Sequence, residues 1–350
     1  MTLVDEKFMR RCLQLARCGV GSTSPNPVVG AVIVCDGRII GEGYHIRAGE
    51  PHAEVNAVNS VKAADRHLLS RSTIYVTLEP CSHYGKTPPC CDMIIAKGLK
   101  RAVVGSVDSN ASVNGGGIAR MRDAGINVVV GVLEQECRRL NGAFFASHEL
   151  KRPYITLKWA QTSDGYIDVV RSGGSALNIS TPVSQAAVHK LRAMHDAILV
   201  GTRTAILDNP SLNLRCWAGR SPLRLVIDRG VVLPASLALF DGSVPTIVYT
   251  TCEDAAKCGK NIEQVVLDFS KPVLSGILEH LHSSGVNSLL VEGGSKLLQS
   301  FIDAGLWDAV RVEINENLVV GSGVPAPVFS PISAWEVSSC GGNKILYCRK

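Results

Sequence analysis

The chain has 350 residues, of which 46% are hydrophobic and 19% charged, and its formal net charge is +5. This length allows two domains of ordinary size, and the composition excludes a disordered chain. The basic residues are scattered and aromatic residues make up only 5%, which argues against a nucleic-acid partner.

The sequence predicts neither a leader nor a membrane span. Asp5, Glu6 and Lys7 interrupt the first residues, which contain no apolar run. No stretch of about 18 apolar residues follows, so we expect no membrane partner. Twelve cysteines are too few for a disulfide-stapled secreted scaffold of this length. We therefore expect a cytoplasmic protein with free thiols.

Strand and helix signals alternate through the first half of the chain. The expected strands are 28–34, 38–44, 74–78, 102–107 and 128–132; the expected helices begin near Pro51 and Cys90 and cover 118–123 and 134–140. This order predicts a mostly parallel sheet covered by helices.

A candidate metal site lies within this pattern. His52-Ala53-Glu54 opens a predicted helix, and Cys81 and Cys90 follow the strand 74–78. One imidazole and two thiolates are three ligands that suit zinc, and they leave the fourth tetrahedral position for water, as in catalytic sites. Glu54 can then move protons without binding the metal. This is the layout of zinc-dependent deaminases that act on nucleobases.

The loop between the two cysteines is unusually long. Eight residues separate Cys81 from Cys90, where the deaminase signature has two. His83 and Lys86 lie in this loop, which prolines stiffen, so we expect it to form one wall of a pocket. We interpret Cys91 as a spare thiol, because one of the two adjacent cysteines completes the ligand set.

A domain boundary is expected near Ser147–Lys151, so the predicted domains are residues 1–148 and 152–350. The second half again alternates, with expected strands at 153–158, 197–201, 223–228, 246–250, 288–292 and 310–314 and expected helices at 183–191, 202–207, 275–283 and 296–303. Its sequence contains no second His-x-Glu motif.

Two loops of the second half are candidate phosphate sites. Glu292-Gly293-Gly294-Ser295 ends a strand and opens a helix, where backbone amides can cradle a phosphate. Such turns are also common without any ligand. The polar loop Asp208–Arg215 offers a carboxylate and a guanidinium, which could hold a sugar hydroxyl and a phosphate, but an exposed turn explains it as well. The residues alone therefore indicate an α/β domain with a candidate phosphate site.

Taken together, these motifs resemble the bifunctional deaminase–reductase family of riboflavin biosynthesis over nearly the whole chain. In the first half the resemblance rests on 24–34, 41–45, His52-Ala53-Glu54 and the stretch from Thr77 to Cys90; in the second half it rests on 153–168, 197–201, Thr204, Asp208–Arg215 and 291–295. Three places depart from the family pattern. Tyr166 stands where lysine is usual, Asn178 stands where tryptophan is common, and Asp108-Ser109-Asn110-Ala111 lacks the two usual prolines.

The resemblance implies an α/β protein with an N-terminal cytidine-deaminase-like three-layer domain and a C-terminal dihydrofolate-reductase-like domain. It implies one zinc ion per chain and NADPH as cofactors. The implied reactions are deamination of 2,5-diamino-6-ribosylamino-4(3H)-pyrimidinone 5′-phosphate and reduction of its ribosyl group to ribityl. This gives 5-amino-6-(ribitylamino)uracil 5′-phosphate.

The residue roles that the resemblance implies fall into four groups. His52, Cys81 and Cys90 would bind zinc and Glu54 would be catalytic; Asn26, His45, Lys86, Lys158, Arg192, Asp208, Leu212, Arg215 and Glu292 would bind substrate; Thr204, Asp208, Gly293, Gly294 and Ser295 would bind the cofactor.

Two alternatives remain open at the level of sequence. One is a zinc deaminase of nucleic acid or of another nucleoside, with a non-catalytic C-terminal domain. The other is a non-catalytic zinc protein, which would not need Glu54 beside the ligands and would usually bring a fourth protein ligand. The expected partner is a small pyrimidine nucleotide, and the sequence leaves a homo-oligomer open.

Overall fold

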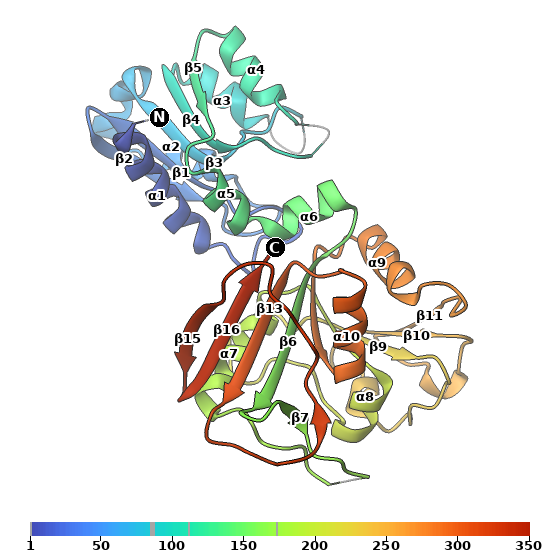
Figure 1. Ribbon diagram of the computed structural model, residues 1–350. Helices are drawn as coiled ribbons and strands as arrows, with labels where there is room; N and C mark the ends of the chain where they lie inside the picture. The colour runs from blue at the N-terminus through green and yellow to red at the C-terminus, as the bar shows by residue number, and fades with distance from the viewer. Residues whose placement is uncertain (1, 85–87, 111–112, 173) are drawn as a thin grey trace. The chain divides into compact units, whose positions relative to one another are not determined.

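The computed structural model describes residues 2–84, 88–110, 113–172 and 174–350. The chain divides into two compact units, Met1–Lys151 and Arg152–Lys350, each built around its own sheet (Figure 1).

The first unit is a five-stranded sheet between two layers of helices. Its strands are β1 (Gly30–Cys35), β2 (Arg38–Tyr44), β3 (Thr73–Leu78), β4 (Arg101–Ser106) and β5 (Asn127–Val130), and its helices are α1 (Leu3–Arg17), α2 (Ala53–Asn59), α3 (Cys90–Ala96), α4 (Gly116–Asp123), α5 (Glu134–Leu140) and α6 (Gly142–Leu150), with a 3₁₀ helix at Ala63–Arg71. The strand order is β2-β1-β3-β4-β5.

Alternation of side chains along the strands creates the three layers. Ala31 and Ile33 of β1 pack with α2, α3 and α4, whereas Val32 and Val34 pack with α1 and α5. Because both faces are covered, nearly every residue of β1, β3 and β4 is buried. The three-layer fold expected from the family resemblance is confirmed.

The expectation of a mostly parallel sheet was wrong for one edge. β3, β4 and β5 run parallel, but β1 pairs antiparallel with both β2 and β3. The hairpin between β1 and β2 reverses the chain, and the connection through α2 then passes over β1 before β3 begins. Strand signals in the sequence do not reveal this crossing.

Two helices of the first unit were not expected. α1 carries six charged residues, which obscured its buried stripe of Phe8, Met9, Cys12 and Leu13 in the sequence. α6 continues to Leu150, so a helix occupies most of the segment where the boundary was expected.

The second unit is a nine-stranded sheet with an additional two-stranded ribbon. Its strands are β6 (Tyr154–Thr162), β7 (Tyr166–Asp168), β8 (Ala197–Val200), β9 (Leu223–Asp228), β10 (Thr246–Thr250), β11 (Ile262–Val266), β12 (Ser288–Gly293), β13 (Ala309–Asn315), β14 (Val324–Pro325), β15 (Glu336–Cys340) and β16 (Asn343–Arg349), and its helices are α7 (Pro182–Ala193), α8 (Thr202–Asp208), α9 (Val273–Ser283) and α10 (Ser295–Asp303), with 3₁₀ turns at Ala238–Phe240 and Ala255–Lys257.

The large sheet has the order β11-β10-β9-β8-β12-β6-β13-β16-β15. Its first seven strands are parallel, and the hairpin β15–β16 adds antiparallel pairing at one edge. Six of the parallel strands agree with the sequence predictions, whereas β11 and this hairpin were not predicted.

The two faces of the large sheet differ in polarity, and this difference positions the site. On one face Ile155, Leu157 and Trp159 of β6 pack against α9 and α10. On the other face the same strand presents Thr156 and Lys158, while β13 presents Arg311 and Glu313. A buried row of charges on a sheet requires polar partners or a ligand.

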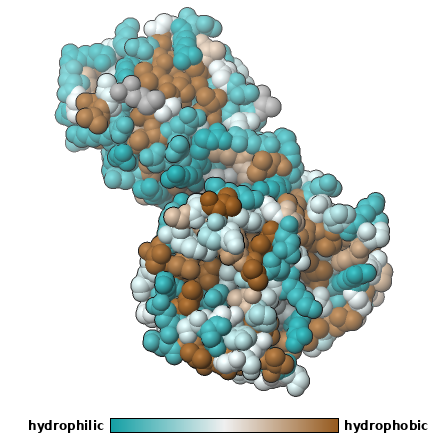
Figure 2. Space-filling model, in the orientation of Figure 1, coloured by the Kyte–Doolittle hydropathy of each residue, from teal (hydrophilic) through white to brown (hydrophobic). Residues whose placement is uncertain are grey.

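No helix within the described part of the chain is both long and apolar enough to cross a membrane. On the face shown in Figure 2, hydrophilic residues are spread over both units between smaller hydrophobic areas.

Candidate active sites in the two units

The three residues predicted to bind metal come together in the first unit. His52 precedes α2, Cys81 follows β3, and Cys90 begins α3. α2 lies directly on β2, because Gly41 and Gly43 leave room for it: a Cβ at Gly43 would stand 2.3 Å from the backbone nitrogen of Ala57. The tight packing of α2 therefore depends on these glycines.

The geometry of the cluster fits a tetrahedral zinc ion. His52 Nδ1 lies 3.6 Å from Cys81 Sγ and 3.4 Å from Cys90 Sγ. A tetrahedral zinc with ordinary bond lengths holds its nitrogen and sulfur ligands about 3.6 Å apart. Among the described residues this is the one group of three or more His, Cys, Asp or Glu side chains close enough to share an ion.

The surroundings of the cluster favour a thiolate at Cys81. Hydrogen bonds from the Cys90 thiol and from His52 lower the pKa of Cys81 to about 4, although burial acts in the opposite direction. The backbone N–H of Cys90 also donates to Cys81 Sγ at 3.2 Å. Zinc binds thiolates, so these contacts prepare the ligand set.

Glu54 is buried beside the cluster, with 3% of its surface exposed. Burial raises the pKa of Glu54 to about 7, although His52 acts in the opposite direction. A carboxyl group with such a pKa can both accept and release a proton near neutral pH.

Asn26 and His45 form one wall next to the metal cluster. The His45 ring packs edge-on against His52, with ring centroids 5.4 Å apart. Its Nδ1 lies 3.2 Å from the Pro51 carbonyl oxygen and its Nε2 lies 3.2 Å from Asn26 Nδ2. Burial lowers the pKa of His45, so the ring is neutral: Nδ1–H donates to the carbonyl and Nε2 accepts from the amide. Lys86, predicted on the same site, lies outside the described residues.

Glu79 is a functional candidate that the sequence analysis missed. Its buried carboxylate accepts backbone N–H groups from Asp108, Gly115, Gly117 and Ile118, at 2.9–3.2 Å. It thereby ties the segment after β4 and the first turn of α4 to the strand end that carries Cys81. In the sequence, the signal for this residue was its position two residues before the metal ligand Cys81.

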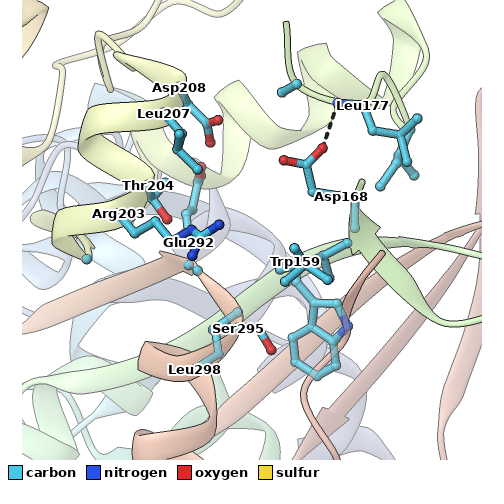
Figure 3. Close-up of a pocket in the computed structure, with 18 of the residues that line it drawn as sticks. Trp159, Asp168, Leu177, Arg203, Thr204, Leu207, Asp208, Glu292, Ser295 and Leu298 are labelled. Atoms are coloured by element: carbon cyan, nitrogen blue, oxygen red, sulfur yellow. Dashed lines mark hydrogen bonds between the residues drawn. The ribbon is translucent and has the colours of Figure 1, made fainter. Parts of the chain in front are cut away.

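The second unit contains a pocket of about 1000 Å³, lined by residues from both faces of its sheet. Figure 3 shows that Thr204 and Asp208 reach it from α8, Asp168 and Leu177 from the segments around β7, and Glu292 and Ser295 from the end of β12 and the start of α10. The pocket lies at the carboxyl ends of parallel strands, where open α/β sheets bind ligands.

Most of the predicted reductase residues line this pocket: Lys158, Arg192, Thr204, Asp208, Arg215, Glu292, Gly293, Gly294 and Ser295. Leu212 does not; its side chain is 2% exposed and belongs to the core under α7 and α8. Any contact of Leu212 with substrate would have to come from its backbone.

Buried charges at the floor of the pocket are only partly paired. Arg192, which lies within α7 and not after it, donates two hydrogen bonds to Glu292, at 2.9 and 2.7 Å. Burial opposes ionisation of Glu292, but Arg192 and Lys158 overcome it and lower the pKa of this carboxyl to about 2. Burial lowers the pKa of Lys158, whose ammonium makes no hydrogen bond or ion pair to the described residues. Lys158 is thus available to a ligand.

The charge of the pocket suits anionic nucleotides. Six cationic and three anionic side chains line it: Lys158, Arg171, Arg192, Arg203, Arg215 and Lys296 against Asp168, Asp208 and Glu292. Gly293 has a φ of 128°, which favours glycine, and Gly294 approaches α8 so closely that a Cβ there would stand 3.0 Å from Thr204 Oγ1. A nucleotide phosphate fits such a lining.

Comparison with known proteins agrees with both sites. Residues 3–106 match the family described as the cytidine and deoxycytidylate deaminase zinc-binding region, and residues 153–333 match the RibD C-terminal domain. The riboflavin biosynthesis protein RibD of Aquifex aeolicus is 41% identical over 92% of this chain and 89% of its own length. The chain belongs to the RibD family.

Further RibD relatives cover the same span. That of Escherichia coli is 37% identical over 90% of this chain and 88% of its own. A crystal structure from Thermotoga maritima, described as a diaminohydroxyphosphoribosylaminopyrimidine deaminase and 5-amino-6-(5-phosphoribosylamino)uracil reductase, superimposes with a TM-score of 0.87, at 37% identity, over 99% of this chain and 98% of its own.

Membership of the RibD family decides between the readings of the sequence. The protein is a bifunctional enzyme of riboflavin biosynthesis, a zinc-dependent hydrolase and an NADPH-dependent oxidoreductase acting on a small molecule. A deaminase with a non-catalytic C-terminal domain is no longer supported.

Proposed function

We propose that residues 1–148 deaminate 2,5-diamino-6-ribosylamino-4(3H)-pyrimidinone 5′-phosphate. Residues 152–350 then reduce the ribosyl group of the product, giving 5-amino-6-(ribitylamino)uracil 5′-phosphate. The name of the Thermotoga maritima relative supports both substrates. The observation that carries the first assignment is the His52–Cys81–Cys90 cluster with buried Glu54 beside it.

In the deaminase site each residue has a separate task. His52, Cys81 and Cys90 would hold zinc, which would supply the Lewis acid for activating water toward the amidine carbon of the pyrimidine. Glu54 takes a proton at its carboxylate and returns it to the departing amine. Asn26 and His45 bind the pyrimidine nucleotide from one wall, and Lys86 contributes a cation from the intercysteine loop.

In the reductase site, Thr204, Asp208, Gly293, Gly294 and Ser295 bind NADPH, which supplies the hydride. The nucleotide substrate is bound by Lys158, Arg192, Asp208, Arg215 and Glu292, and by Leu212 through its backbone. Lys158 supports this assignment, because its half-buried ammonium makes no hydrogen bond to the described residues and would be stabilised by an anionic or hydroxyl-bearing ligand.

The setting of the enzyme completes the proposal. We expect it in the cytoplasm, because its twelve cysteines include a metal site that needs reduced thiols. We expect no nucleic-acid partner, since the cations lining the reductase pocket suit a mononucleotide and a dinucleotide. A homo-oligomer remains a prediction.

The substitution Glu54→Gln tests this proposal. The variant should keep its zinc and lose deamination by about 10²-fold or more, the effect expected for removing a general acid–base. Reduction of the deaminated nucleotide should remain within about twofold of wild type, because the second unit has its own pocket. Glu149→Gln, which changes an exposed carboxylate of the same unit, is the matched control and should alter neither rate. Substantial deamination by zinc-loaded Glu54→Gln would remove Glu54 from the mechanism.

A further inference from the structure

An arginine that the sequence analysis did not select joins two walls of the reductase pocket. Arg171 lies between β7 and α7, and its side chain is only 7% exposed. Its Nε donates to Asp168 Oδ2 at 2.7 Å, and its Nη1 donates to the carbonyl oxygens of Gly174 and Leu207 at 2.9 and 3.1 Å. Its Nη2 donates to Asp208 Oδ1. One guanidinium thus fastens the segment after β7 to the end of α8.

The connected segment forms a large part of the pocket wall. Val170, Arg171 and residues 176–180 all line the cavity. Asp168 holds the segment from its other end, because its Oδ1 accepts the backbone N–H of Leu177 at 3.0 Å. In Figure 3 the carboxylates of Asp168 and Asp208 face each other, and the Arg171 contacts bridge this gap.

The positive charge of Arg171 gives its contact with Asp208 a role in ligand binding. Asp208 is half-exposed in a pocket that takes two phosphate-bearing molecules, so its carboxylate would repel them if it were uncompensated. Arg171 places a positive charge on that carboxylate and fixes one of its two oxygens. No described residue donates a hydrogen bond to the other oxygen, Oδ2, which can therefore accept one from a hydroxyl group of a ligand.

We propose that Arg171 is a positioning residue of the reductase site, which orients and neutralises Asp208 for contact with the ribose of the nucleotide cofactor. This inference rests on the cofactor-binding role assigned to Asp208 above. Arg171 need not touch the cofactor, and its effect passes through Asp208 and the segment after β7.

The test is a double-mutant cycle on the full-length protein with Arg171→Ala, Asp208→Asn and the two combined. The Michaelis constant for NADPH and kcat are measured with the deaminated nucleotide, and NADPH affinity is measured by its fluorescence. Arg171→Ala should raise the Michaelis constant for NADPH about 10-fold or more, as expected for a lost charge-assisted contact, with kcat changed less than about threefold. In the Asp208→Asn background the same substitution should change it less than about threefold.

A matched control separates positioning from loss of fold. Arg152→Ala removes another partly buried arginine–carboxylate pair of the same unit, with Asp308, and should lower thermal stability without changing the Michaelis constant for NADPH. If Arg171→Ala does not fold, Arg171→Lys carries the same cycle, because lysine keeps the charge and loses the multiple contacts.

The outcomes are distinct. Equal effects of Arg171→Ala in both backgrounds, or an unchanged Michaelis constant, would overturn the role of Arg171. If Asp208→Asn itself leaves NADPH binding unchanged, the assigned role of Asp208 is wrong and the inference falls with it. A raised Michaelis constant in Asp208→Asn together with an unaffected Arg171→Ala would refute only the inference.

Discussion

Replacing Asp5 by asparagine tests what holds the first helix on the deaminase unit. Asp5 is 2% exposed, on the face of α1 that packs against β1 and β3. Its carboxylate accepts two hydrogen bonds from Arg101, at 2.8 and 3.0 Å, and one from the Tyr75 hydroxyl at 3.1 Å. A buried carboxylate with these partners should contribute measurably to stability.

The size of the effect follows from the pKa. The hydrogen bond from Arg101, opposed by burial and aided by Thr2, lowers the pKa of Asp5 from 3.8 to about 2. Each pKa unit corresponds to about 1.4 kcal/mol, so ionised Asp5 stabilises the folded unit by about 2 kcal/mol at neutral pH. Because the folded pKa is the lower one, this stability is present above about pH 4 and is lost as the pH falls toward about 2.

The assay is urea unfolding at pH 7, followed by zinc release to a coloured chelator, which reports the first unit. Asp5→Asn should lower its free energy of unfolding by about 2 kcal/mol. Tryptophan fluorescence is an internal control, because all four tryptophans, at 159, 217, 307 and 335, lie in the second unit. Asp36→Asn removes an exposed carboxylate paired with Arg71 and should cause no measurable change. Equal behaviour of the two variants would refute the reasoning.

Three further outcomes are expected. Arg215→Ala should weaken binding of the reductase substrate about 10- to 100-fold, if its guanidinium holds the phosphate, and should have little effect on the dephosphorylated nucleoside; equal losses on both would end the phosphate assignment. Zinc removal by a chelator should abolish ammonia release while NADPH oxidation continues, and parallel loss of both would mean that the units are coupled. Glu79→Gln should destabilise the first unit by about 1–3 kcal/mol in the urea assay, because an amide NH₂ cannot accept the N–H groups that the carboxylate accepts; an unchanged midpoint would contradict this role.

The metal ligands could be predicted from the sequence, because few residue types bind zinc. His52, Cys81 and Cys90 combine rare ligand types at strand and helix ends, so their meeting at one place required only the expected alternation of elements. Nine of the residues that the family resemblance implied for the reductase line its pocket, and most of them lie on a parallel strand or follow one.

Contacts that depend on the path of the chain could not be predicted. Nothing in the sequence around Arg171 shows that the segment after β7 returns to the end of α8, so the arginine looked like an ordinary loop residue. The antiparallel pairing of β1 with β3 likewise depends on the crossing of α2. The hairpin β15–β16 was a different case, since Gly341 and Gly342, both with positive φ, were a readable turn signal that was overlooked.

The most direct measurement is a paired assay on the purified full-length protein loaded with zinc. Ammonia release from 2,5-diamino-6-ribosylamino-4(3H)-pyrimidinone 5′-phosphate is followed without NADPH, and NADPH oxidation is followed separately on the deaminated product. The account predicts both activities, with ammonia release independent of NADPH and NADPH oxidation independent of Glu54. Ammonia release without any NADPH oxidation would contradict it. So would NADPH oxidation that occurs only with the substrate that has not been deaminated.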